Sequence, residues 1–260
     1  MTRRFNLLLA LAVLFIALPY YWLLVDNHPG EAAPRPLAIG RLRELAGELP
    51  GQRPVAIAVE RAAYRLVPGN VMAAGSGMKR RLYSNLVFRL DVPGKGPVVI
   101  DAISSRGEAG RQGLTLAGKP TQDRIAAALH DASLVLATRG TPASAGGRPR
   151  AIAPGIVVIP APVPTPGHRM IYLRMADGRE YLLAGEVAPH AASYRQMRGR
   201  SRLMTDHVRP EDRETAIAWL ATIRELQRQA PELRVIPGHD LAWLASPEHR
   251  GWLTLRFPES

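Results

Sequence analysis

The chain opens with its longest apolar run. Residues 1–25 place Arg3 and Arg4 ahead of roughly twenty mostly apolar, uncharged residues, a length that spans a hydrocarbon core as a helix. A cleaved signal peptide is the alternative, but it needs a shorter core and a small-residue cleavage site, and the aromatics at 20–22 occupy that place. The pattern predicts a transmembrane signal anchor. Basic residues before the span and Asp26 after it predict that the amino terminus stays in the cytoplasm.

Two segments follow the predicted anchor. Residues 26–50 are first rich in Pro, Gly and Ala and then turn amphipathic at about 41–48, which predicts a linker and a short helix. Residues 51–260 carry the mixed pattern of a folded domain.

Apolar residues in the rest of the chain alternate between two periods. Period-two or continuous apolar stretches predict strands at 83–92, 97–101, 155–163, 169–175, 180–186 and 233–236, another beginning at Leu134, and a strand or a hairpin at 54–66. Helical spacing predicts helices at 121–131 and 210–229, the second with an apolar face of Ala216, Trp219, Leu220, Ile223 and Leu226. Strands in two groups, each flanked by helices, predict an α/β fold with two sheets packed face to face and helices outside.

One loop stands out by what it lacks. The segment 134–147 reads LVLATRGTPASAGG, a strand that ends in small residues. Loops placed this way on a rigid scaffold commonly carry chemistry. This one offers Arg139, Thr141, Ala143 and Ser144, with no His, Asp, Glu or Cys.

The frame of this loop resembles the metal-binding loop of the metallo-β-lactamase superfamily, in which a strand runs into T-H-x-H-x-D-H and then a Gly-Gly pair. Thr138 and the pair Gly146 and Gly147 match that frame. The four ligand positions of the motif fall on Arg139, Thr141, Ala143 and Ser144, so each ligand is replaced.

Further segments resemble the same superfamily in the same order, over residues 70–245. Asn85 and Asp101 match its early N-x-x-x and I-D segments, Gly185-Glu186 matches a Gly-Asp pair with Glu in place of the bridging Asp, and VIPGHD keeps the terminal histidine as His239. The stretch APVPTPGH resembles the A-P-G-H-T-P-G loop, with the ligand histidine replaced by Pro164 in the register that avoids a gap. A rival register makes His168 that ligand.

The resemblance implies the αββα sandwich of the metallo-β-lactamase type and a site for one or two zinc ions. A catalytic zinc needs three protein ligands and an open position. Only Glu186 and His239 remain in the preferred register, and His168 makes a third in the rival one. The resemblance therefore implies a degenerate member without a cofactor. Zinc is expected only if the chain is a divergent hydrolase that uses residual or relocated ligands.

Arg139 stands at a former ligand position and suggests a substitute for the metal. An unpaired buried carboxylate is costly, so we expect Arg139 to supply a positive charge to Glu186 and to make the pocket cationic. Two alternatives stay open: Glu186 pairs with some other arginine at the end of its strand, and His239 caps a turn.

Composition narrows the list of partners. The chain has no cysteine, which excludes thiol catalysis, disulfides and thiolate zinc sites. Its net charge of +12 comes from 34 Lys and Arg against 22 Asp and Glu. The arginines are scattered without an aromatic stacking pattern, which disfavours nucleic acid. Attraction to an anionic lipid surface or an anionic small ligand fits better, and a simple solvated surface also explains the charge.

These observations predict a single-pass protein of the inner, cytoplasmic membrane with its domain on the periplasmic side. The predicted function is that of a membrane-anchored, catalytically degenerate metallo-β-lactamase-like domain that acts as a binding or scaffolding module. The alternative is a divergent metallo-hydrolase, so the sequence leaves open whether the chain is an enzyme.

Overall fold

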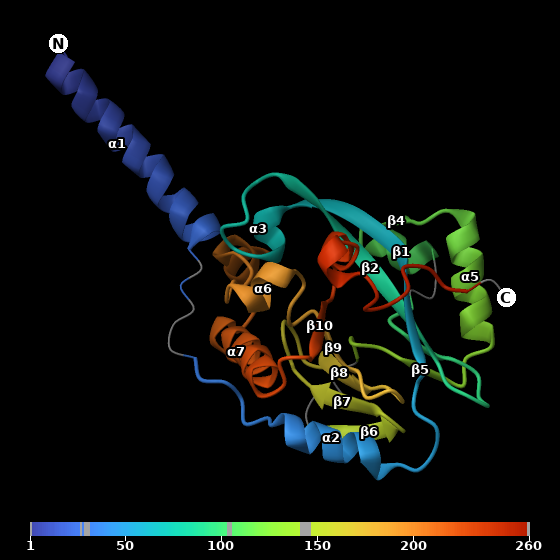
Figure 1. Cartoon of the computed structure of the whole chain (residues 1–260). Helices are drawn as coiled ribbons and strands as arrows, with labels where there is room; N and C mark the ends of the chain where they lie inside the picture. The colour runs from blue at the N-terminus through green and yellow to red at the C-terminus, as the bar shows by residue number, and fades with distance from the viewer. Residues whose placement is uncertain (1, 27, 29–31, 103–105, 141–146, 259–260) are drawn as a thin grey trace.

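Two five-stranded sheets lie face to face at the centre of the molecule (Figure 1). The computed structural model describes residues 2–26, 28, 32–102, 106–140 and 147–258. The first sheet has the order β4-β1-β2-β3-β5, with β1 (Ala56–Pro68), β2 (Arg80–Asp91), β3 (Val98–Ile100), β4 (Thr115–Leu116) and β5 (Leu134–Leu136). The second has the order β10-β9-β8-β7-β6, with β6 (Arg150–Ala153), β7 (Ile156–Pro160), β8 (Arg169–Arg174), β9 (Glu180–Gly185) and β10 (Arg234–Pro237).

Alternation along β9 explains how the layers hold together. Tyr181 and Leu183 point into the core between the sheets, and Leu182 and Ala184 point to the opposite face, which the helices cover. Every residue of β9 is buried for that reason. A strand covered on both faces reads as a continuous apolar run, which is the pattern that these segments show in the sequence.

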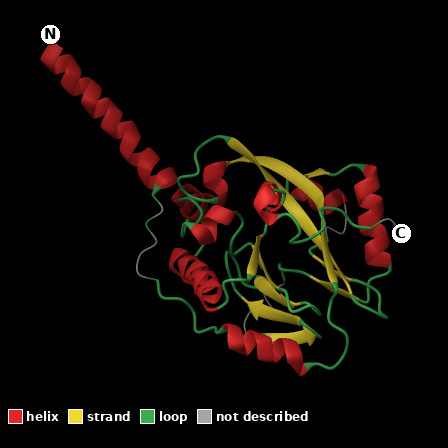
Figure 2. Cartoon of the chain, viewed as in Figure 1, coloured by secondary structure: helices red, strands yellow, loops and turns green. Residues whose placement is uncertain are grey.

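Helices cover the outer face of each sheet (Figure 2). On the second sheet lie α2 (Ile39–Glu48), α6 (Ala191–Arg195) and α7 (Arg213–Gln229), and on the first lies α5 (Lys119–His130). The layers are therefore helix, sheet, sheet, helix, as predicted. The apolar face predicted for residues 210–229 is buried along α7, whose first turn is capped by the side chain of Asp212.

The structure refines several predicted elements. The segment 54–66 forms one long strand, β1, and not a hairpin. The helix expected in the linker packs into the core through Leu42 and Leu45, and Arg43 binds both carboxylate oxygens of Glu180 at 2.7 Å. The sequence pattern missed α3 (Gly69–Met72), α4 (Arg106–Arg111), α8 (Leu241–Leu244) and a π-helix at Leu203–Val208, because elements this short show no periodicity.

The N-terminal helix α1 (Thr2–Tyr20) projects away from the domain and continues as a π-helical turn over Tyr21–Val25 (Figure 1). The change of helix type follows Pro19, which cannot donate a backbone hydrogen bond. Within Thr2–Val25, the most apolar stretch of 18 residues has a mean hydropathy of 2.4 and contains no buried residue. By length and composition it can cross a membrane, a property that signal sequences share.

Candidate functional site

The candidate site lies where strands of both sheets end at one edge. Asp101 follows β3, Thr138 and Arg139 follow β5, Glu186 follows β9, and His239 follows β10. Two of these turns touch, because a Cβ on Gly238 would lie 2.3 Å from the backbone oxygen of Gly185. Only glycine permits that approach, so Gly238 brings the loops carrying Glu186 and His239 together.

Glu186 is the centre of a buried polar cluster. Its side chain is 4% exposed, and its Oε1 accepts a hydrogen bond from the Tyr83 hydroxyl at 3.0 Å and lies 3.1 Å from Nε2 of His239. Burial by itself would raise the pKa of the Glu186 carboxyl. The charge and hydrogen bond of His239 and the guanidinium of Arg200 outweigh burial and hold that pKa well below its usual range. Glu186 is therefore a carboxylate at neutral pH.

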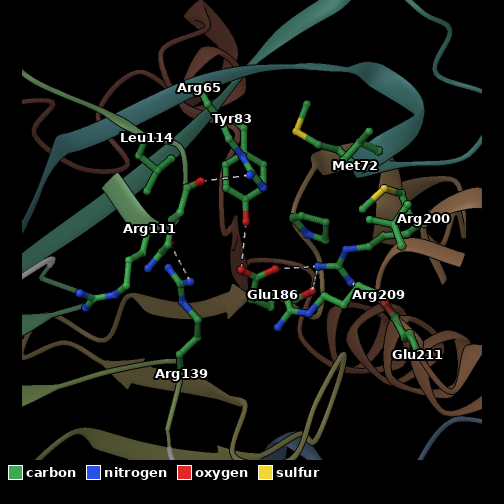
Figure 3. Close-up of a pocket in the computed structure, with 15 residues that line it drawn as sticks. Arg65, Met72, Tyr83, Arg111, Leu114, Arg139, Glu186, Arg200, Arg209 and Glu211 are labelled. Atoms are coloured by element: carbon green, nitrogen blue, oxygen red, sulfur yellow. Dashed lines mark hydrogen bonds and ion pairs between the residues drawn. The ribbon is translucent and has the colours of Figure 1, made fainter. Parts of the chain in front are cut away.

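The cation that pairs with Glu186 is Arg200. Its Nη2 donates to Oε2 of Glu186 at 2.7 Å and to the backbone oxygen of Glu186 at 2.8 Å, while its Nη1 lies 3.1 Å from Glu211. The Arg200 side chain is only 12% exposed, so this ion pair is shielded from water. Figure 3 shows the guanidinium of Arg200 between the two carboxylates.

Arg139 was expected to be this partner, and that prediction is wrong. Arg139 donates from Nη1 to the side chain of Gln112 at 3.3 Å and forms no salt bridge with a carboxylate in the described part of the chain. It lies on the opposite side of Glu186 from Arg200 (Figure 3). The alternative is confirmed: Glu186, at the end of its strand, pairs with an arginine other than Arg139.

His239 does more than cap a turn. Its Nδ1 donates to the carbonyl of Ser84 at 2.9 Å, which directs Nε2 toward Glu186 and the Tyr83 hydroxyl, 2.7 Å away. The rings of His239 and Tyr83 stack with centroids 3.7 Å apart. Tyr83 thus fills space beside both retained residues, and burial, followed by the charge of Glu186, raises the pKa of its hydroxyl.

Asp101 forms a second, separate anchor at this edge. Its two carboxylate oxygens accept hydrogen bonds from the backbone N and the Oγ1 of Thr138, at 2.6 and 2.7 Å. Asp101 has a φ of 65°, an uncommon conformation for a residue with a side chain. Burial raises the pKa of this carboxyl despite the bonds from Thr138. The pairing fixes the start of the loop that carries Arg139.

The remaining predicted site residues do not join the cluster. His168 is 5% exposed and its Nδ1 bonds to the carbonyl of Thr165 at 2.8 Å. Neither His168 nor Pro164 lines the small cavity between Glu186 and His239. Thr141, Ala143 and Ser144 lie outside the described residues. Tyr83 and Arg200 could not be predicted as site residues, since neither stands at a position that resembles the family motifs.

A larger cleft opens on one side of Glu186. It has a volume of about 570 Å³, and its wall includes Arg65, Arg111, Arg139 and Arg209 as well as Arg200. The two carboxylates in the wall, Glu186 and Glu211, both pair with Arg200. Since Arg65, Arg111, Arg139 and Arg209 form no salt bridge with any carboxylate that the structure describes, the cleft is strongly cationic.

Several solved structures with a similar fold are N-acyl homoserine lactone hydrolases. A quorum-quenching N-acyl homoserine lactone lactonase matches 81% of this chain and 99% of its own, with a TM-score of 0.60 and 12% identity. A hydrolase with N-hexanoyl-L-homoserine bound at its catalytic metal center matches 80% and 99%, with a TM-score of 0.59 and 11% identity. An AiiA variant from B. thuringiensis with N-decanoyl-L-homoserine at its active site matches 80% and 99%, with a TM-score of 0.57 and 13% identity.

The chain has the metallo-β-lactamase fold. No protein-family model and no curated protein sequence matches it. At 11–13% identity the solved structures establish the fold and not the activity. The similarity therefore shows the fold, and the chemistry of this chain depends on the residues at its own site.

The described residues do not suit the metal of this fold. Among them, no group of three His, Cys, Asp or Glu side chains is arranged to hold a metal ion. Glu186 and His239 are two donors where a zinc needs three, and the guanidinium of Arg200 lies 2.7 Å from the Glu186 carboxylate. A dication placed beside Glu186 would be repelled by that guanidinium.

Proposed function

We propose that this chain is a membrane-anchored binding module of the metallo-β-lactamase fold, without hydrolase activity, whose cleft takes an anionic ligand. One observation carries the proposal. Arg65, Arg111, Arg139 and Arg209 line a single cleft and have no described carboxylate as a salt-bridge partner. Four cations gathered at one concave surface repel each other, and an anion in the cleft would relieve that repulsion.

Loss of metal chemistry follows from the position of Arg200. In a hydrolase of this fold, the cation at the carboxylate would activate a water molecule. Here the cation at Glu186 is a guanidinium, which has no open coordination position and stays protonated. Glu186, Arg200 and His239 thus form a hydrogen-bonded cluster that supports one wall of the cleft.

The geometry of the arginines suits a compact anion with several oxygens. A guanidinium presents its N–H groups as a fork that matches a carboxylate or phosphate group. Arg111 and Arg139 lie on one side of the cleft, and Arg209 lies on the other (Figure 3). A polyanion between them would contact both sides. A monoanionic carboxylate would contact fewer donors and should bind more weakly.

The packing of the chain after α1 supports an anchor that is not removed. The guanidinium carbon of Arg202 lies 3.9 Å from the centroid of the Trp22 ring. The same guanidinium pairs with the Asp26 carboxylate at 3.0 Å. Asp26 is 7% exposed and its backbone oxygen accepts from Arg213. Burial raises the pKa of Asp26, but the hydrogen bonds from the His28 backbone and Arg202 keep it below its usual value. Removing residues 1–26 would take away the carboxylate that pairs with Arg202 and the backbone oxygen that accepts from Arg213.

A binding experiment with inorganic pyrophosphate tests the proposal. The full chain in detergent should bind pyrophosphate saturably in calorimetry. Arg139→Gln and Arg209→Gln should each weaken binding about tenfold, which corresponds to about 1.4 kcal/mol. Arg150→Gln, an exposed arginine on β6, is the matched control and should leave the affinity unchanged. Absence of binding, or equal weakening in the control, contradicts the cationic cleft.

A further inference from the structure

A face of the domain beside the end of α1 combines exposed apolar and basic side chains. We name it the α1-proximal face. Its apolar members are Leu66, Met78, Leu82, Leu203 and Val208, and its basic members are Lys79, Arg80 and Arg209. Met78 is 53% and Val208 is 62% exposed. Most apolar side chains of this size are buried elsewhere in the domain, so their gathering at one end needs an explanation.

Backbone contacts fix this face next to the end of the membrane helix. The N of Gly75, in the loop that leads to β2, donates to the carbonyl of Leu24 at 3.0 Å. The N of Ala74 donates to Gly199 at 2.8 Å, which joins that loop to the segment that leads to the π-helix at Leu203–Val208. Figure 1 shows α3 and the adjoining end of the β1–β2 hairpin beside the point where α1 meets the domain, with α5 on the far side.

Only a few residues separate the predicted membrane helix from the packed domain. Tyr20, Tyr21 and Trp22 are the aromatic residues that would lie at the lipid–water interface if α1 spans the bilayer. Asp26, a few residues later, is already packed against Arg202. The loop that bonds to Leu24 must then lie near the headgroups, and so must Met78 and Lys79 a few residues further on.

The cleft and the α1-proximal face share residues. Val208 and Arg209 belong to both, and both are exposed. On the neighbouring hairpin, Leu66 pairs with Leu82 and Arg65 pairs with Tyr83 across the two strands. Successive side chains point to opposite sides of a strand, so the leucine pair lies on the outer side while Arg65 and Tyr83 line the cleft. One hairpin thus contributes to both surfaces.

We propose that the α1-proximal face rests on an anionic lipid leaflet and that the cleft takes the phosphate headgroup of an anionic phospholipid from that leaflet. This inference rests on the proposed function, namely the retained anchor and the anion-binding cleft. The apolar side chains would enter the interfacial layer, and Lys79 and Arg80 would contact lipid phosphates. A phospholipid headgroup supplies the oxygen-rich anion that the arginine forks fit, at the depth where the anchor places the cleft.

Site-specific labelling tests where the face lies. The chain has no cysteine, so Met78→Cys and Val208→Cys each carry a single environment-sensitive fluorophore. The labelled full chain is reconstituted in nanodiscs of phosphatidylcholine with a spin-labelled lipid quencher, with or without phosphatidylglycerol. We expect strong quenching at positions 78 and 208 in the discs with phosphatidylglycerol. Val135→Cys is the matched control, because Val135 is 54% exposed and lies on β5, and we expect no quenching there.

Charge reversal tests the part played by the basic residues. Lys79→Glu with Arg80→Glu should reduce quenching at position 78 in phosphatidylglycerol discs several-fold. The control pair Arg148→Glu with Arg150→Glu makes the same change in net charge at and beside β6 and should not reduce it. Quenching that is equal at positions 78 and 135, or that does not depend on phosphatidylglycerol, overturns the placement of the face.

Lipid retention tests the headgroup in the cleft. Native mass spectrometry of the full chain in detergent should show phosphatidylglycerol bound in preference to phosphatidylcholine. Arg139→Gln should lower its occupancy about tenfold and Arg150→Gln should not. Pyrophosphate binding without phosphatidylglycerol binding overturns the lipid assignment and leaves the proposed function intact. Loss of pyrophosphate binding itself is a failure of the proposed function.

Discussion

Arg200 lies 2.7 Å from Glu186, the carboxylate at the position that resembles the Gly-Asp pair of the metallo-β-lactamase motifs. The same guanidinium lies 3.1 Å from Glu211, and the side chains of both carboxylates are at most 4% exposed. One arginine therefore neutralises two buried carboxylates. This relationship determines what each partner contributes to stability and what the site can bind.

Arg200→Leu should destabilise the domain by about 3–5 kcal/mol, since it leaves buried carboxylates without a cation. Adding Glu186→Gln to Arg200→Leu should recover part of that loss, because a neutral amide is cheaper to bury than a charge. Thermal or chemical unfolding of the single and double variants measures the coupling. Arg139→Leu is the control, and its half-exposed side chain should cost less than about 1 kcal/mol. Strictly additive effects at 186 and 200 would contradict a functional ion pair.

The purified chain should contain far less than one zinc or iron per molecule, because Glu186 and His239 supply two metal donors, the described residues add no third His, Cys, Asp or Glu arranged with them, and Arg200 repels a dication. Elemental analysis after dialysis measures the metal content, and a chelator should leave the melting temperature unchanged. Stoichiometric metal that disappears in His239→Ala would instead support the divergent hydrolase.

His168 should make the domain less stable in mild acid. Burial, together with the charges of Arg209 and Arg139, lowers the pKa of His168 from its ordinary 6.5, although a bond to Thr165 and the charge of Glu186 act the other way. The unfolded chain then binds more protons than the folded one below pH 6.5, and the free energy of unfolding falls as pH drops through that value.

The variant His168→Gln should therefore lose less stability than the parent between about pH 7 and pH 5. Urea unfolding at a series of pH values measures the difference. His130→Gln is the control, because the His130 side chain is 88% exposed. Parallel pH profiles for the parent and His168→Gln would show that the buried imidazole contributes nothing.

The full-length chain should retain residues 1–25 and expose its domain outside the cytoplasm. Intact mass of the membrane-extracted protein checks the first statement, and protease added to spheroplasts of a Gram-negative host checks the second. A cytoplasmic marker should stay intact in the same spheroplasts. A domain that resists protease until the cells are lysed would reverse the topology. A mass that lacks the first residues would replace the anchor with a signal peptide.

The layers of the fold were predictable because burial follows a local period. Leu182 and Ala184 alternate with Tyr181 and Leu183, and the apolar face of α7 recurs at helical spacing. The meeting of Thr138, Glu186 and His239 at one edge was also predictable, since all three stand at positions that resemble a known motif.

The ion pair between Glu186 and Arg200 was not predictable, because two residues that meet in the fold need not have any characteristic separation along the sequence. Arg200 lies in an irregular segment rich in arginine, and nothing in the sequence distinguishes it from Arg198 or Arg202. Arg139 stands at a position that resembles a ligand position, which indicates a contact with Glu186, but its side chain turns toward Gln112. The sequence around Tyr83 indicates only the start of a strand, although alternation along β2 puts Tyr83 on the side opposite Leu82.

Arg200 also changes how the domain depends on its surroundings. A metal ion stabilises a fold only to the extent that its free concentration exceeds the dissociation constant, so such a protein is sensitive to scarcity and to chelators. A guanidinium bonded to the chain is always present, and it arrives with the polypeptide. On the function proposed above, the domain completes its folding without an ion from outside, and we expect its stability to be the same in a metal-starved compartment as in a metal-rich one.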